Sequence, residues 1–119
     1  MRKEEIISYF NLNETQTKKV ELFVSKIIYH NKHTNLIGFS TVENIWDRHV
    51  LDCLQLSKYI NEKKLKILDL GTGAGLPGIL LSIIGYKNIL MIDSVKKKTD
   101  FVKNTIQELS LTAKIQNKR

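Results

Sequence analysis

The sequence predicts an α/β fold with a parallel β-sheet, helices on both faces and an N-terminal helical extension. Residues 65–70 and 88–93 are short apolar runs typical of buried strands. A glycine-rich turn, residues 71–78, follows the first run, and a helical pattern lies between the two. Another helical pattern, residues 96–109, precedes a third possible strand at 113–116. Strand–helix–strand–helix–strand order is typical of a parallel sheet covered by helices.

Composition is that of one small globular domain. The chain has 119 residues, of which 42% are apolar and 26% are charged, which excludes collagen-like, low-complexity and fully disordered chains. The longest mostly apolar run, 79–84, is too short to cross a membrane, and the N-terminus does not resemble a secretory signal. The single cysteine, Cys53, has no internal disulfide partner, so we expect a reducing, cytoplasmic location.

The charge is basic and unevenly distributed. The net charge is +7, with +2 in residues 1–64 and +5 in residues 65–119. This pattern favours a nucleic acid over an anionic membrane as partner, although charge alone is equally consistent with solubility. Three lysines, 96–98, together with Lys103, either contact phosphate or form a solvated helix start.

The N-terminal part, residues 1–62, is expected to be helical. Val20, Phe23, Val24, Ile27 and Ile28 follow the spacing of a core-facing helical stripe, and Asn13 or Thr15 is a candidate cap. A second helix is expected from about Thr41 to Tyr59. The character of the sequence changes at residue 63, so we divide the chain into a helical extension, 1–62, and an α/β part, 63–119.

The glycine turn is the segment most informative about chemistry. A strand that runs into glycines and then a helix directs backbone N–H groups at a ligand. Asp93, 22 residues beyond Gly71, ends the next strand, where a carboxylate can accept hydrogen bonds from ribose hydroxyls. The sequence therefore predicts a cofactor that contains a nucleoside. A turn that serves packing alone is the less favoured reading.

The identity of the cofactor depends on a second acid. Residues 73–78 satisfy the dinucleotide pattern G-x-G-x-x-G, which keeps a nicotinamide or flavin site open. Asp69, however, stands two residues before the first glycine, and a carboxylate there disfavours a pyrophosphate. S-adenosylmethionine has a sulfonium, an amino group and no phosphate. We therefore favour S-adenosylmethionine, and we identify no metal-ligand set.

The segment 67–79, ILDLGTGAGLPGI, resembles the cofactor loop of the ribosomal small-subunit methyltransferase G family, also called glucose-inhibited division protein B. Residues 35–37, 48–52 and 93–101 are similar to further signatures of that family, so the resemblance covers about residue 20 to Arg119. It implies a Rossmann-like class I methyltransferase that methylates N7 of a guanine in 16S ribosomal RNA of the small ribosomal subunit. Guanine N7 has a free lone pair, so no catalytic base is assigned.

The resemblance also implies roles for individual residues. Gly71 and Leu76 would contact the cofactor, Gly73 and Gly75 would shape the turn, Asp93 would hold the ribose, and Asp69 would face the methionine end. Two departures stand out: Cys53 replaces the family's usual serine, and the family pattern continues beyond Arg119 with further strands. We therefore expect an incomplete sheet. A non-catalytic truncated remnant and a fragment of a nucleotide-dependent oxidoreductase are the alternative functions.

Overall fold

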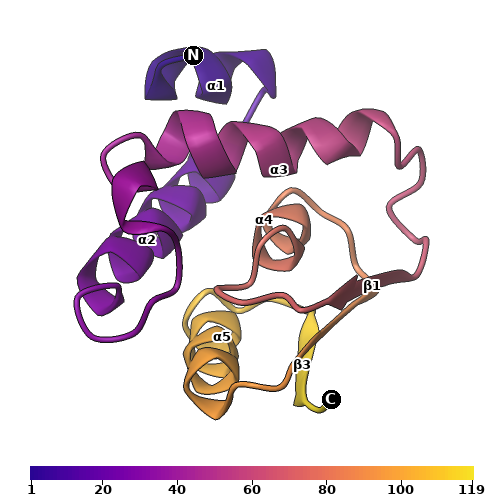
Figure 1. The fold of residues 1–119 in the computed structure, drawn as a ribbon. Coiled ribbons are helices and arrows are strands. Elements are labelled where there is room, and N and C mark those ends of the chain that lie inside the picture. The colour runs from indigo at the N-terminus through magenta and orange to yellow at the C-terminus, as the bar shows by residue number, and fades with distance from the viewer.

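The computed structural model describes residues 1–119 as an α/β structure in which the N-terminal helices pack over a helix that lies on a three-stranded sheet (Figure 1). The chain runs through α1 (Lys3–Tyr9), α2 (Glu14–His30), the 3-10 turn η1 (Phe39–Thr41), the π turn η2 (Trp46–Val50), α3 (Leu51–Gln55), the 3-10 turn η3 (Leu56–Lys58), β1 (Ile67–Leu70), α4 (Gly78–Ile83), β2 (Ile89–Asp93), α5 (Lys96–Glu108) and β3 (Lys114–Asn117). No helix is long and apolar enough to span a bilayer.

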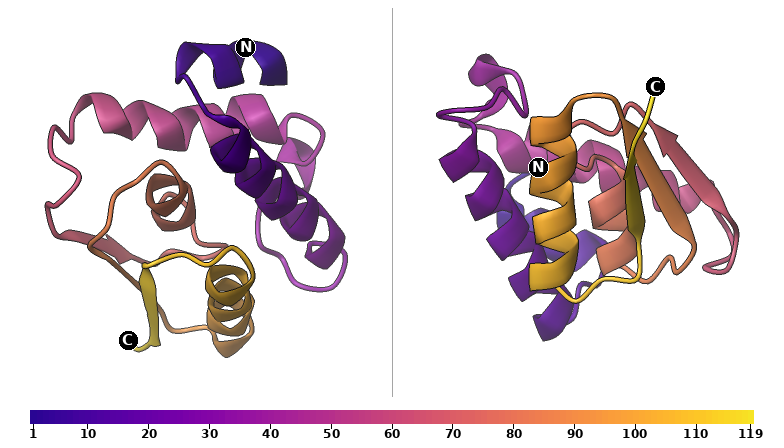
Figure 2. Two further views of the ribbon diagram at one scale, coloured as in Figure 1. Left: turned by 180° about the vertical axis from the view of Figure 1, so that it is seen from behind. Right: turned by 90° about the horizontal axis from the view of Figure 1, so that it is seen from below.

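The sheet is parallel, as predicted, with the strand order β1-β2-β3. The crossovers between these strands contain α4 and α5, and both helices lie on the same face of the sheet (Figure 2). Our expectation of helices on both faces is therefore met on one face only within residues 1–119. Alternate side chains of a strand point to opposite faces, and Leu68 and Leu70, on the uncovered face, are 57% and 69% exposed.

The core lies between the covered face of the sheet and the N-terminal helices. Every residue of α4 is buried, because α2 and α3 pack over it. Of the apolar stripe on α2, four residues are buried as predicted, whereas Ile28 is partly exposed at the edge. The buried apolar residues of both parts form one continuous cluster. The division at residue 62 marks a change of architecture, and as a domain boundary it stays a prediction.

Local hydrogen bonds explain where the N-terminal helices begin. Asn13 Oδ1 accepts a hydrogen bond from the Gln16 backbone N–H at 2.8 Å, and Gln16 Oε1 accepts one from the Asn13 N–H. This reciprocal pair satisfies two N–H groups that a helix start otherwise leaves free, so Asn13 is the cap of α2. The prediction of a helix from Thr41 to Tyr59 is wrong in its first part, because the continuous helical segment begins with a π turn at Trp46. Thr41 instead ends η1, where its hydroxyl donates to Gly38 O.

Candidate functional site

The two acids singled out in the sequence lie at the same edge of the sheet. In the β1–β2 register Asp69 pairs with Met91, and Asp93 follows one residue after the partner of Leu70. Both strands are parallel, so their carboxyl ends meet where ligands commonly bind in open α/β sheets. The glycine loop, residues 71–77, runs from this edge into α4. The structure therefore brings all six predicted cofactor residues together: Asp69, Gly71, Gly73, Gly75, Leu76 and Asp93.

Asp69 is half-buried beneath the glycine loop and supports it. Its Oδ2 accepts hydrogen bonds from the Thr72 hydroxyl at 2.6 Å and from the Gly78 backbone N–H at 3.0 Å. The pKa of Asp69 is raised, because burial outweighs these two stabilising hydrogen bonds and the negative charge of Asp93 adds to the effect of burial. A cation beside this carboxylate would relieve that cost.

Asp93, the last residue of β2, also holds the glycine loop through a hydrogen bond. Its Oδ2 accepts the backbone N–H of Gly73 at 2.8 Å, and its Oδ1 accepts that of Val95 at 2.9 Å. Burial alone would raise its pKa, but these N–H groups and the charge of Lys98 outweigh burial and lower the pKa of Asp93. The carboxylate is therefore ionised at neutral pH, and its remaining lone pairs can accept hydrogen bonds from a ligand.

The glycines of the loop serve two different purposes. Gly71 and Gly73 have φ values of 69° and 60°, and a Cβ on either would meet nothing within 4 Å. They are required by backbone conformation and leave open space above the loop. Gly75 also has a positive φ of 94°, and a Cβ on it would lie 2.5 Å from Ile79 Cγ1. A Cβ on Gly78, the first residue of α4, would lie 2.5 Å from Met91 Sδ, so both positions permit close packing.

Two residues that hold the site were not predicted. Thr72 and Gly78 fix the Asp69 carboxylate, which in turn fixes the start of α4. The available sequence signal was a hydroxyl residue between two glycines, three positions after an acid. Leu76 lies at the end of the loop, where its backbone N–H donates to Thr72 O at 3.1 Å and its side chain packs against the core. The ligand contacts of all six predicted residues stay predictions.

His49 and Cys53 lie on the consecutive helical segments η2 and α3. His49 Nε2 lies 2.8 Å from the Thr41 hydroxyl, and burial lowers the pKa of its ring, so it is neutral at physiological pH. Burial and the charges of Asp52 and Asp69 raise the pKa of the Cys53 thiol to about 12, which makes it a poor nucleophile. No group of three or more His, Cys, Asp and Glu side chains converges as a metal site.

Comparison with known proteins finds matches over most of the chain. Residues 16–119 match the GidB family, described as rRNA small subunit methyltransferase G. Relatives named ribosomal RNA small subunit methyltransferase G include those of Rickettsia prowazekii strain Madrid E, 39% identical over 102 residues, and Orientia tsutsugamushi strain Boryong, 35% identical over 108 residues. The match covers 86% and 87% of this chain but 53% and 54% of those relatives. The chain therefore spans about half the length of the curated relatives it matches, and it belongs to the rRNA small subunit methyltransferase G family.

Proposed function

We propose that this chain binds S-adenosylmethionine and transfers its methyl group to N7 of a guanine in 16S ribosomal RNA. Membership of the family and the names of the relatives support the reaction class and the RNA substrate. The small ribosomal subunit would be the partner and the cytoplasm the location. The single observation that carries the cofactor assignment is the glycine loop held between the carboxylates of Asp69 and Asp93.

The site fits S-adenosylmethionine better than a dinucleotide. Two carboxylates at one edge of the sheet repel a pyrophosphate, whereas they attract a sulfonium and an amino group. The open space above Gly71 and Gly73 leaves room for a ligand against the backbone. S-adenosylmethionine, when bound, supplies an electrophilic methyl group. A nicotinamide dinucleotide is disfavoured because the Asp69 carboxylate beneath the loop has the same negative charge as the phosphates of that cofactor.

The chain's own residues would act by binding and orientation. Asp93 would accept the ribose hydroxyls with lone pairs that Gly73 and Val95 leave free. Asp69 would face the cationic methionine end, with Oδ2 committed to the loop and Oδ1 available. Guanine N7 has a lone pair and needs no base to become nucleophilic. Positioning of the two reactants, which can contribute about 7–11 kcal/mol, would then supply the rate enhancement.

A methyl-transfer assay tests this proposal. The purified chain is incubated with tritiated S-adenosylmethionine and small ribosomal subunits that lack the modification, and Asp93→Ala is run in parallel. The expected result is label in 16S RNA at a guanine that becomes sensitive to borohydride and aniline, as N7-methylguanine is, with much less label for the variant. Absence of label would contradict activity in this chain and favour the non-catalytic alternative.

A further inference from the structure

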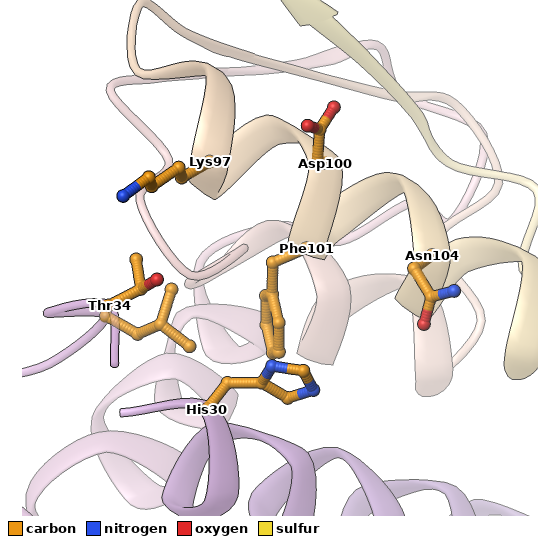
Figure 3. Close-up of a pocket in the computed structure, with 7 residues that line it drawn as sticks. His30, Thr34, Lys97, Asp100, Phe101 and Asn104 are labelled. Carbon is orange, nitrogen blue, oxygen red and sulfur yellow. The ribbon is translucent and has the colours of Figure 1, made fainter. Parts of the chain in front are cut away.

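A cavity of about 340 Å³ lies between the C-terminal end of α2 and α5. His30 and Thr34 line it from one side, and Lys97, Asp100, Phe101 and Asn104 line it from α5 (Figure 3). Its volume is within the range of small-molecule sites in proteins. Helix α5 starts three residues after Asp93, so one element connects the cavity to the proposed cofactor site.

An aromatic pair forms the floor of this cavity. Phe101 projects from α5 toward His30, and their ring centroids lie 5.3 Å apart at an interplanar angle of 67° (Figure 3). Phe101 is 8% exposed and anchored in the core, whereas His30 is exposed. Lys26 Nζ lies 5.7 Å from the Phe101 centroid and is paired with Glu108. Rings of this kind are surfaces on which single-stranded bases stack.

The rim of the cavity offers both donors and acceptors. Asn104 Oδ1 accepts a hydrogen bond from Lys26 Nζ at 2.7 Å, so the Asn104 NH₂ group is left to donate. Asp100 accepts from Lys96 Nζ at 3.1 Å and keeps further lone pairs. Lys97 and Thr34, on the other side of the aromatic pair, add an ammonium and a hydroxyl (Figure 3). A nucleobase edge carries the same mixture of donors and acceptors.

We propose that this cavity binds an unstacked base of single-stranded RNA, with Lys97 at the rim beside the adjoining phosphate. The inference rests on the proposed function, because that function makes RNA the substrate. The Asp100 carboxylate in the lining repels a phosphate inside the cavity, which favours a base as the occupant. The cavity therefore contributes to RNA binding outside the cofactor site and selects unpaired over base-paired RNA.

The experiment compares exposed residues of the cavity with matched residues outside it. A fluorescein-labelled single-stranded oligoribonucleotide of about ten nucleotides and the same sequence as a duplex are titrated with the intact chain, and fluorescence anisotropy is recorded. His30→Ala is compared with His33→Ala, and Lys97→Gln with Lys103→Gln. Each control makes the same change at an exposed residue that does not line the cavity. Calorimetric titration with S-adenosylhomocysteine is run on every variant.

The wild-type chain is expected to prefer the single strand over the duplex. Loss of one stacking surface should weaken single-strand binding by about tenfold in His30→Ala and abolish that preference, with His33→Ala unchanged. Lys97→Gln should weaken binding and reduce its salt dependence more than Lys103→Gln does. Equal effects of each variant and its control, equal affinity for single strand and duplex, or no RNA binding would overturn the inference.

The cofactor titration separates this inference from the proposed function. Binding of S-adenosylhomocysteine by a chain whose His30→Ala and His33→Ala variants behave alike toward RNA overturns the base-binding cavity and leaves the cofactor site standing. Cavity-dependent RNA binding without S-adenosylhomocysteine binding supports the cavity and contradicts the proposed cofactor function.

Discussion

The backbone N–H of Gly73 donates to Asp93 Oδ2 over 2.8 Å, so the last residue of β2 holds the loop that follows β1. The other oxygen of Asp93 holds the start of α5 through the Val95 N–H. One carboxylate thus sets the relative position of the glycine loop and α5. The shape of the site and the acceptor proposed for the ribose depend on the same side chain.

Asp93→Asn should weaken both the fold and ligand binding. An amide has one acceptor oxygen where the carboxylate uses two, so one backbone N–H loses its partner. We expect a loss of about 1 kcal/mol in the free energy of unfolding, below the usual range for bonds to charged groups because the site is open to solvent. Asp100→Asn, at an exposed acid on α5, is the control. Urea unfolding checks the change, and equal stability of the two variants would contradict it.

The stability difference between wild type and Asp93→Asn should depend on pH. The pKa of Asp93 is lowered in the folded chain, so the folded state favours the carboxylate. Its contribution is present above the unfolded value of about 3.9 and is lost as pH falls through the lower folded pKa. Thermal unfolding of both proteins from pH 7 downward should show the two Tm values converging below about pH 4. A difference that stays constant over this range would contradict the assignment.

Asp69→Asn should have the opposite effect on stability. The pKa of Asp69 is raised by burial, so the ionised side chain opposes folding at neutral pH. An amide oxygen can still accept from Thr72 and Gly78, and we expect a higher Tm for the variant at pH 7 together with weaker S-adenosylhomocysteine binding. Differential scanning fluorimetry and calorimetric titration measure the two effects. A variant that is less stable at pH 7 would show that the charge supports the loop.

The glycines should differ in their tolerance of alanine. Gly71→Ala introduces only a side chain at positive φ, which costs about 1–2 kcal/mol. Gly75→Ala adds to this a contact at 2.5 Å with Ile79 Cγ1, and overpacking typically costs about 1–3 kcal/mol more. Urea unfolding should therefore rank Gly75→Ala as the more destabilised variant. The reverse order would mean that the loop relaxes around a Cβ at residue 75.

Lys26 joins α2 to α5 and is sensitive to the loss of its partners. Its Nζ, on a side chain that is 10% exposed, contacts Asn104 Oδ1 at 2.7 Å and Glu108 Oε1 at 3.3 Å. Asn104→Ala leaves a buried ammonium short of one partner and should cost about 1–3 kcal/mol. Lys26→Met in the same chain should recover much of that loss, because no buried charge remains. A double variant no more stable than Asn104→Ala would contradict this explanation.

Much of the site could be predicted because its signals are local. Apolar runs ending in glycine or aspartate marked β1 and β2, and Asn13, one of two candidate caps with Thr15, marked the start of α2. The same signals located Asp69 and Asp93 at one edge, since parallel strands align their carboxyl ends.

One error is local, and the other features that were missed depend on tertiary contacts. The prediction of a helix from Thr41 is an error of local structure: Thr41 ends η1, and its hydroxyl donates to Gly38 O. The support of Asp69 by Gly78 spans nine residues, and the contact of Lys26 with Asn104 spans 78. The cavity between α2 and α5 has no local sequence signal for the same reason. Both crossover helices lie on the same face of the sheet, and the pattern of apolar residues in the strands does not predict which face a helix covers.

Calorimetric titration of the 119-residue chain with S-adenosylhomocysteine, with NAD as the control, tests the central claim most directly. The carboxylates of Asp69 and Asp93 around the glycine loop predict binding of S-adenosylhomocysteine and no binding of NAD. Binding of NAD alone would support the oxidoreductase alternative. A chain that is folded by circular dichroism and binds neither compound would contradict the claim that this loop and its two acids form a cofactor site.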